Sequence, residues 1–413
     1  MKKILIFLSL FITFSFALAQ QASLSVSNNG KYVISVDDSG NAYLWDLKNN
    51  VSKNLGNNYN PRSAYFVPNS DNYLLQNIKT KEVTITNVNG KIIKEFTPDF
   101  MADSQAINSS LTTWVGSLPW GDAYQYNLDT GKKKQIYVSW SYAKSEHSPY
   151  WRGNPYKGGL PNGYAINNQF NFANNDVLIM TADSIMVIYN AKEHKWKLIN
   201  KNVNQTMSAI DPNSEFVYTL DSSRVGRAVK YDLQNNKIIT FPNTANEDNF
   251  FFNLAQRNEI PKLENNYKKP NGYTNFGFID NNKVLITYKG MSQPYLWTGL
   301  YDINNIKIGK FYKDGKSNFA IDNPIKYFPL INNPKDYLDG NYNIEPRPNV
   351  DGYNYTFDTS VEAHKLVIGQ ANGNGIMVYN YNPSDETLKL DWVGEPPKVE
   401  EKKEEKSKGW FEW

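Results

Sequence analysis

One short pattern recurs seven times in this 413-residue chain and restricts the fold more than any other feature. Each copy ends a run of alternating apolar and polar residues with an aromatic residue or threonine followed by Asp or Asn. The alternation predicts strands, and the Asn-, Asp- and Gly-rich segments between the runs predict tight turns. The pairs are Trp45-Asp46, Thr86-Asn87, Tyr126-Asn127, Tyr189-Asn190, Tyr231-Asp232, Tyr301-Asp302 and Tyr379-Asn380.

The spacing of these pairs indicates a repeat. Successive pairs lie 41, 40, 63, 42, 70 and 78 residues apart. Three gaps match a unit of about 40 residues, the size of a four-stranded propeller blade, and the other three are that unit plus an insertion. A turn signal precedes each pair: NNGK at 28–31, PNSDN at 68–72, NSS at 108–110, ANND at 173–176, DPNSE at 211–215, DNNK at 280–283 and SVEAHK at 360–365.

By these residues the chain resembles the WD-repeat β-propeller family. The sequence GKYVISVDDSGNAYLWDL at 30–47 is its best match, and the pattern extends over roughly 22–394. The resemblance implies an all-β fold, a seven-bladed propeller of four-stranded antiparallel blades with long insertions on one face. Two stacked β-sandwich domains, the alternative, would not require the same unit seven times.

Ring closure is a separate question, because propellers of this family usually complete one blade with strands from both chain ends. Here Ser23–Ser27 is expected to be the innermost strand of blade one, and Thr387–Val393 the fourth strand of blade seven. We therefore expect closure through apolar packing between blades one and seven rather than through shared hydrogen bonds.

The N-terminus has the features of a signal peptide. Lys2 and Lys3 precede an apolar run and the small-residue site Ala17-Leu18-Ala19. The run from Ile4 to Ala19 has 16 residues, fewer than the roughly 20 of a spanning helix. An uncleaved membrane anchor is the alternative. We predict cleavage of residues 1–19, a propeller at 20–394, a periplasmic or secreted location, and no transmembrane segment after cleavage.

Composition argues against several functions. The 44 basic and 41 acidic residues give no support to a nucleic-acid-binding face. The absence of cysteine excludes disulfides, thiolate metal sites and thiol catalysis, and three histidines leave little for a histidine-based site, so no cofactor or metal is expected. The segment 37–41 reads as a hairpin turn, since it lacks the distal Glu of a calcium loop. A pair of carboxylates distant in sequence leaves a hydrolase open as an alternative.

Three insertions, at about 142–163, 243–272 and 314–352, are expected to join a fourth strand to the next first strand and so to share one face. They are rich in Tyr, Trp, Phe and Arg, residue types that dominate protein interfaces and also suit sugars. Packing of these aromatics onto the ring is the alternative. The candidate binding residues are Tyr150, Trp151, Arg152, Tyr156, Phe251, Arg257, Tyr327 and Tyr342.

The C-terminal segment 395–413 changes composition abruptly. Pro396-Pro397 cannot continue a strand ladder, and the Lys/Glu run that follows has no apolar stripe. The chain then ends in Trp410, Phe411, Glu412 and Trp413, which we interpret as a docking peptide on a charged, disordered tether. Folding back onto the propeller is the alternative.

Together these features predict an exported, non-enzymatic propeller that binds or scaffolds an envelope or extracellular protein. A propeller that binds a glycan or another small ligand is the second possibility, and a hydrolase the third.

Overall fold

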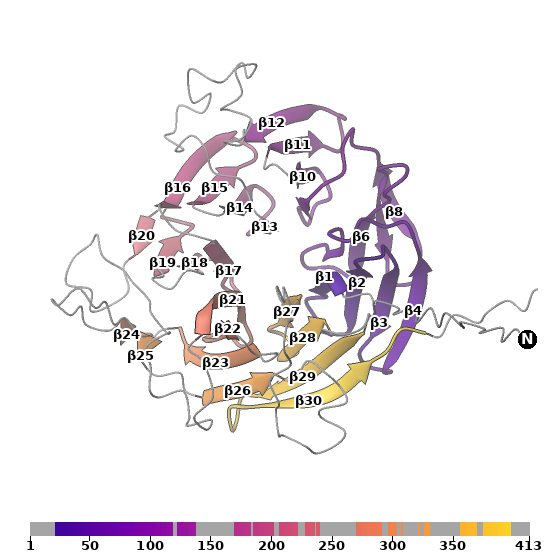
Figure 1. The fold of residues 1–413 in the computed structure, drawn as a ribbon. Coiled ribbons are helices and arrows are strands. Elements are labelled where there is room, and N and C mark those ends of the chain that lie inside the picture. Colours follow the sequence, from indigo (N-terminus) through magenta and orange to yellow (C-terminus); the bar gives the residue numbers. More distant parts are fainter. Residues whose placement is uncertain are drawn as a thin grey trace, which may run out of the picture.

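The computed structural model describes residues 21–118, 122–137, 169–182, 185–201, 206–221, 228–235, 237–239, 270–290, 296–303, 307–308, 321–322, 326–330, 356–369 and 375–397. These residues form strands and turns, and no helix among them is long and apolar enough to cross a membrane. The strands form seven blades arranged in a ring, which confirms the predicted seven-bladed β-propeller (Figure 1). The predicted signal segment, 1–19, lies outside the described residues.

Each blade is an antiparallel sheet whose strands follow one another from the ring axis outward. Blade one comprises β1 (Gln21–Val26), β2 (Tyr32–Asp37), β3 (Ala42–Asp46) and β4 (Val51–Gly56). Blade two comprises β5 (Tyr65–Phe66), β6 (Asn72–Gln76), β7 (Val83–Asn87) and β8 (Ile92–Phe96). Blade three comprises β9 (Ser104–Ile107), β10 (Thr113–Ser117), β11 (Ala123–Asn127) and β12 (Lys133–Tyr137).

The remaining blades follow the same order. Blade four comprises β13 (Gln169–Phe172), β14 (Val177–Ala182), β15 (Ile185–Asn190) and β16 (Lys195–Lys201). Blade five comprises β17 (Thr206–Ile210), β18 (Phe216–Asp221), β19 (Ala228–Asp232) and β20 (Lys237–Ile239). Blade six comprises β21 (Pro270–Phe278), β22 (Lys283–Gly290), β23 (Leu296–Asp302) and β26 (Lys326–Leu330). Blade seven comprises β27 (Phe357–Ser360), β28 (Lys365–Gly369), β29 (Ile376–Asn382) and β30 (Thr387–Gly394).

Blade six departs from the prediction. Its fourth strand was expected before residue 314, but β24 (Lys307–Ile308) pairs only with β25 (Ile321–Asp322), and β26 fills the edge of β23. Pro329 lies in β26, where an outermost strand tolerates the missing N–H. The expected third insertion is therefore divided by a strand, and its first part joins the third strand to the fourth.

The recurring pair has a structural explanation. Trp45 is fully buried, while the carboxylate of Asp46 accepts a hydrogen bond from the N–H of Asn49 at 3.0 Å and so caps the turn to the fourth strand. Asn127 does the same for Thr130 at 2.9 Å. One residue thus anchors the blade and the next closes its turn. The other buried aromatics of the predicted pairs are Tyr189, Tyr231, Tyr301 and Tyr379.

In blade seven the strand end lies two residues later than predicted. β29 continues to Asn382, which accepts a hydrogen bond from the N–H of Ser384 at 3.0 Å. Asn380 instead accepts one from Nζ of Lys365 at 3.0 Å. Tyr379 and Tyr381 are both buried, because residues two apart in a strand share a face. The pair that ends this strand is Tyr381-Asn382.

The first and last blades are each complete, and the ring closes through the predicted apolar packing between them together with hydrogen bonds that were not expected. Val26, Val33 and Trp45 of blade one form an apolar cluster with Val367 and Val378 of blade seven. Side-chain hydrogen bonds reinforce this contact: Ser360 Oγ donates to the carbonyl oxygen of Asn28 at 2.6 Å, and Ser52 Oγ donates to that of Glu395 at 2.9 Å.

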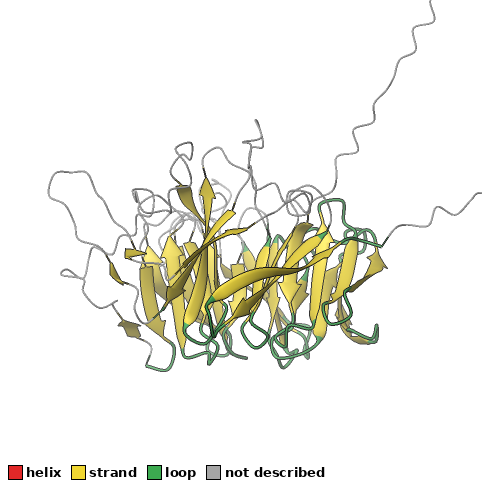
Figure 2. Ribbon diagram, turned by 90° about the horizontal axis from the view of Figure 1, so that it is seen from below, coloured by secondary structure: helices red, strands yellow, loops and turns green. Residues whose placement is uncertain are grey.

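The meander divides the connections between two faces. First-to-second and third-to-fourth turns share one face, which we call the turn face, and second-to-third turns share the other with the links between blades, which we call the link face. Most of the described loops lie on one face of the disc (Figure 2).

Candidate binding site

The structure describes one of the eleven candidate binding residues. Tyr327 lies in β26 and pairs with Gly299 of β23, so it belongs to the outermost strand of blade six and not to an inserted loop as predicted. The others lie outside the described residues, and their role remains a prediction: Tyr150, Trp151, Arg152, Tyr156, Phe251, Arg257, Tyr342, Trp410, Phe411 and Trp413.

Where the structure describes side-chain exposure, the most exposed large apolar side chains all belong to blades one and two. Val51 of β4 is 55% exposed, Ile92 and Ile93 of β8 are 53% and 42% exposed, and Ile78, after β6, is 45% exposed. Both β4 and β8 are outermost strands, so one backbone edge of each has no neighbouring strand in its blade. Such edges are templates for pairing with another chain. We call Val51, Ile92 and Ile93 the apolar rim.

A β-bulge explains why two adjacent isoleucines are both exposed. Thr86 pairs with Ile92 and Ile85 with Lys94, so Ile93 is an extra residue in β8. A bulge twists the edge strand and interrupts its regular ladder. The bulge thus interrupts the regular alternation of β8 at its start, where Ile92 and Ile93 are both exposed.

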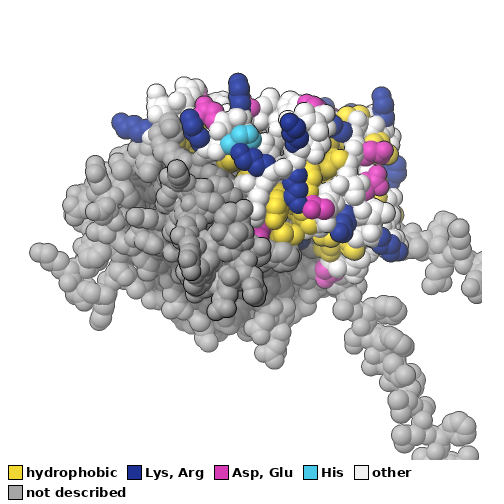
Figure 3. All heavy atoms as spheres, turned by 90° about the horizontal axis from the view of Figure 1, so that it is seen from above, with side chains coloured by type: hydrophobic (Ala, Val, Ile, Leu, Met, Phe, Trp, Pro, Cys, Tyr) yellow, Lys and Arg dark blue, Asp and Glu magenta, His cyan; other side chains and the backbone are white. Residues whose placement is uncertain are grey.

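An aromatic cluster lies at the junction of blades two and three and includes Phe96, the last residue of β8. The Phe100 ring centroid lies 5.3 Å from that of Tyr124, and Trp114 lies 5.3 Å from Tyr126 and 5.5 Å from Phe96. The space-filling view shows apolar side chains reaching the surface among lysine and acidic side chains (Figure 3).

Lys133 of β12 places its ammonium group over this cluster. Its Nζ lies 4.1 Å from the ring centroid of Tyr124 and 2.7 Å from each carboxylate oxygen of Asp99. Burial opposes ionisation of Asp99, but hydrogen bonds from Lys133 and Tyr126 outweigh it and hold the pKa of Asp99 below its ordinary value. Burial, together with the hydrogen bond to Asp99, raises the pKa of Tyr126. At neutral pH the arrangement is therefore a cation held between a carboxylate and ring faces.

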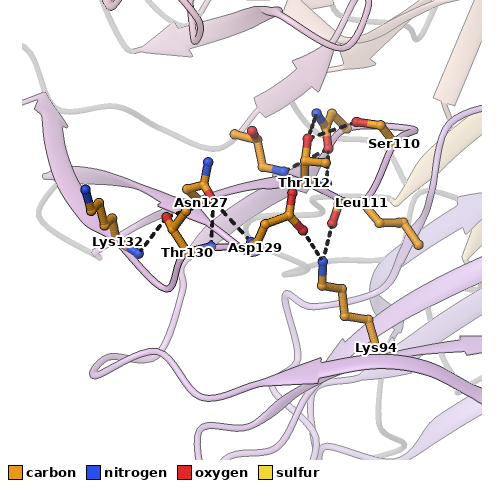
Figure 4. Close-up of polar contacts among 10 residues, drawn as sticks. Lys94, Ser110, Leu111, Thr112, Asn127, Asp129, Thr130 and Lys132 are labelled. Carbon is orange, nitrogen blue, oxygen red and sulfur yellow. Dashed lines mark hydrogen bonds and ion pairs between the residues drawn. The ribbon is translucent and has the colours of Figure 1, made fainter.

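Lys94 attaches β8 to blade three. Its Nζ donates to the carbonyl oxygen of Leu111 at 2.8 Å and pairs with Asp129 Oδ1 at 3.1 Å, contacting both turn-face loops of the next blade (Figure 4). The Asp129 turn is itself capped by Asn127, whose Oδ1 accepts the N–H of Thr130 at 2.9 Å. The rim strand is thus held on a rigid support.

A second polar site lies on the innermost strands. Asp358 Oδ2 accepts the backbone N–H of Val26 at 2.8 Å, and Oδ1 accepts that of Thr359 at 2.8 Å. Burial raises the pKa of Asp358 to about 6, against the opposing effect of these bonds and one from Ser25. Ser25 Oγ also accepts the N–H of Phe66 at 3.1 Å, so blades seven, one and two are linked here.

The described residues contain no group of three or more His, Asp or Glu side chains placed to hold a metal ion. His194 Nδ1 lies 2.9 Å from the Tyr189 hydroxyl, and His364 Nδ1 lies 3.0 Å from the carbonyl oxygen of Ile279. Asp37 accepts the N–H of Asn41 at 2.8 Å, which agrees with the predicted hairpin turn.

Sequence reasoning missed both the rim and the inner carboxylate. Two consecutive isoleucines in an outermost strand were a usable signal, since a regular strand buries only one of its faces. An acid in a first strand, where apolar residues are expected, was a signal for Asp358.

Comparison with known proteins shows the same architecture. No protein-family profile and no curated protein matches the sequence. Kluyveromyces lactis Hsv2 superposes with a TM-score of 0.53 at 11% identity, covering 92% of this chain and 100% of that one. The β-propeller domain of Myceliophteria thermophila Cps50 (Swd1) gives 0.53 at 10% identity, covering 88% and 98%. The Dos1 propeller gives 0.50 at 10% identity, covering 93% and 86%. The likeness is one of fold.

Proposed function

We propose that this chain is an exported, non-enzymatic propeller that binds a protein partner through aromatic loops on its link face. The observation that carries the proposal is the position of three long connections. They run from the end of β12 to the start of β13, from β20 to β21 and from β26 to β27. Each joins a fourth strand to a first strand, so all six flanking strand ends belong to the link face.

The ring supplies a rigid base for these loops. Apolar clusters between neighbouring blades and the closure between blades one and seven fix the strand ends from which the loops start. Tyr, Trp and Arg in such loops have the chemistry of interface hot spots, with large contact area and few rotatable bonds. A rigid base lowers the entropy cost of ordering a binding surface.

The proposal is tested by replacing Tyr150, Trp151 and Arg152 together with Ala in the full chain. Affinity purification from envelope extract should recover the partner with the unchanged protein and lose it with the triple variant, since each hot-spot truncation costs about 2 kcal/mol or more. Thermal unfolding should be unchanged. Lys132→Ala with Lys134→Ala, exposed on the turn face and outer edge, is the control.

Three results would contradict the proposal. Equal recovery of the partner with the triple variant would remove the loops from the binding surface. A fall in melting temperature as large as that of a core substitution would mean that the aromatics pack the ring. Recovery of glycans in place of protein would replace this function with carbohydrate binding.

A further inference from the structure

The chain leaves its last blade along the first one. Beyond β30, Ser52 Oγ of β4 donates a hydrogen bond to the carbonyl oxygen of Glu395 at 2.9 Å. Trp392 packs edge-on against Trp45 with ring centroids 6.1 Å apart, and Pro396 and Pro397 are half-buried. The C-terminal segment therefore starts beside the outermost strand of blade one.

The apolar rim lies on that side of the ring. Val51 is the neighbour of Ser52 in β4, and Ile92 and Ile93 belong to the outermost strand of the next blade (Figure 1). Among the residues whose side-chain exposure the structure describes, no large apolar side chain outside blades one and two is as exposed as these. Exposed apolar side chains beside an open strand edge favour association, which proteins usually prevent by covering the edge.

The remaining chain has the length and the chemistry to provide that cover. Trp410 lies 13 residues beyond Pro397. A tether of that length spans about 45 Å when fully extended and about 20 Å on average when flexible. Its effective concentration near blade one is of millimolar order, so even weak apolar contacts would be occupied. The terminal residues Trp410, Phe411 and Trp413 supply large ring surfaces.

We propose that residues 398–413 fold back onto the outer edge of blades one and two and place Trp410, Phe411 and Trp413 against the apolar rim. The contact covers the open edges of β4 and β8 and competes with any other chain for them. It is independent of the link-face loops, so either proposal can fail without the other.

The test replaces Phe411 with the photo-crosslinking residue benzoylphenylalanine in the full chain at low micromolar concentration. Mass spectrometry of the irradiated, digested monomer should find the crosslink within one molecule, on peptides that contain β4 or β8. Crosslinks elsewhere on the ring, crosslinks only between molecules, or no crosslink would each overturn the proposal.

Rim variants in the same labelled chain make the test specific. Ile92→Ser with Ile93→Ser should lower the crosslink yield by at least about tenfold, because it removes much of the apolar contact. Val51→Ser provides a second variant in a different strand, so that the test survives a folding defect in the first. Lys134→Ser, exposed on the outermost strand of blade three, is the matched control and should leave the yield unchanged. Unchanged yield in both rim variants would overturn the proposal.

Discussion

Asp358 gives the sharpest test of how the ring is held together. Burial raises the pKa of its carboxyl from 3.8 to about 6, even though Val26, Thr359 and Ser25 donate hydrogen bonds to it. One pKa unit corresponds to about 1.4 kcal/mol, so ionised Asp358 weakens folding by about 3 kcal/mol relative to the protonated form. Removing the charge should remove this dependence on pH.

The sign follows from proton binding. Between pH 3.8 and 6 the folded state holds a proton on Asp358 that the unfolded state has lost, so the free energy of unfolding falls as pH rises. The stabilisation from the protonated carboxyl is complete below pH 3.8 and is lost as pH rises through about 6. Asp358→Asn cannot titrate and should not show this loss.

The assay is urea unfolding followed by tryptophan fluorescence at intervals from pH 3.5 to 7.5. The free energy of unfolding of the unchanged protein minus that of Asp358→Asn should fall by about 3 kcal/mol over this range. Other carboxylates, such as Asp99, cancel in the difference. Any fixed effect of the amide on the bond to Val26 moves the whole curve and leaves its slope unchanged.

A flat difference would refute the reasoning, because it would place the pKa of Asp358 at its unfolded value. A difference that rises with pH would mean that the hydrogen bonds outweigh the loss of solvation. Either result would also remove Asp358 as a pH-dependent link between blades seven and one.

Two further predictions concern packing between blades. Gly30 has φ of +61°, and a Cβ there would lie 2.2 Å from Cβ of Ala363. Gly131 has a similar φ of +67°, but nothing lies within 4 Å of a Cβ built there. Gly30→Ala should therefore lower the free energy of unfolding by about 1–3 kcal/mol more than Gly131→Ala. Equal losses in urea unfolding would show that the blade contact yields freely. Lys133→Met keeps the alkyl stem over Tyr124 but removes the ion pair with Asp99 and the cation–π contact. The substitution should lower the free energy of unfolding by about 1–2 kcal/mol. Added salt should then have little effect on the stability of the variant. If added salt does not reduce the difference in stability between the original protein and Lys133→Met, the electrostatic account is wrong.

The sequence determined the repeating architecture because its causes are local. Alternation within a strand decides which side chains share a face. The Asx residue that follows the aromatic caps a turn three residues later, as Asp46 does for Asn49. Seven such units predict a ring of similar sheets, whatever the lengths of the segments that connect them. The same local signals predict that blade one and blade seven each contain four strands of their own.

Tertiary structure decided the features that depend on which segments meet. The edge of β23 accepts any strand-forming segment that reaches it, so neither spacing nor propensity identified β26 as the fourth strand of blade six. The bulge that exposes both Ile92 and Ile93 arises from the register of β8 on β7. The pKa of Asp358 depends on burial against β1 and on Val26, 332 residues away in the chain. Burial and register are properties of the assembled ring, because desolvation of a group is set by all the atoms around it and not by its neighbours in sequence.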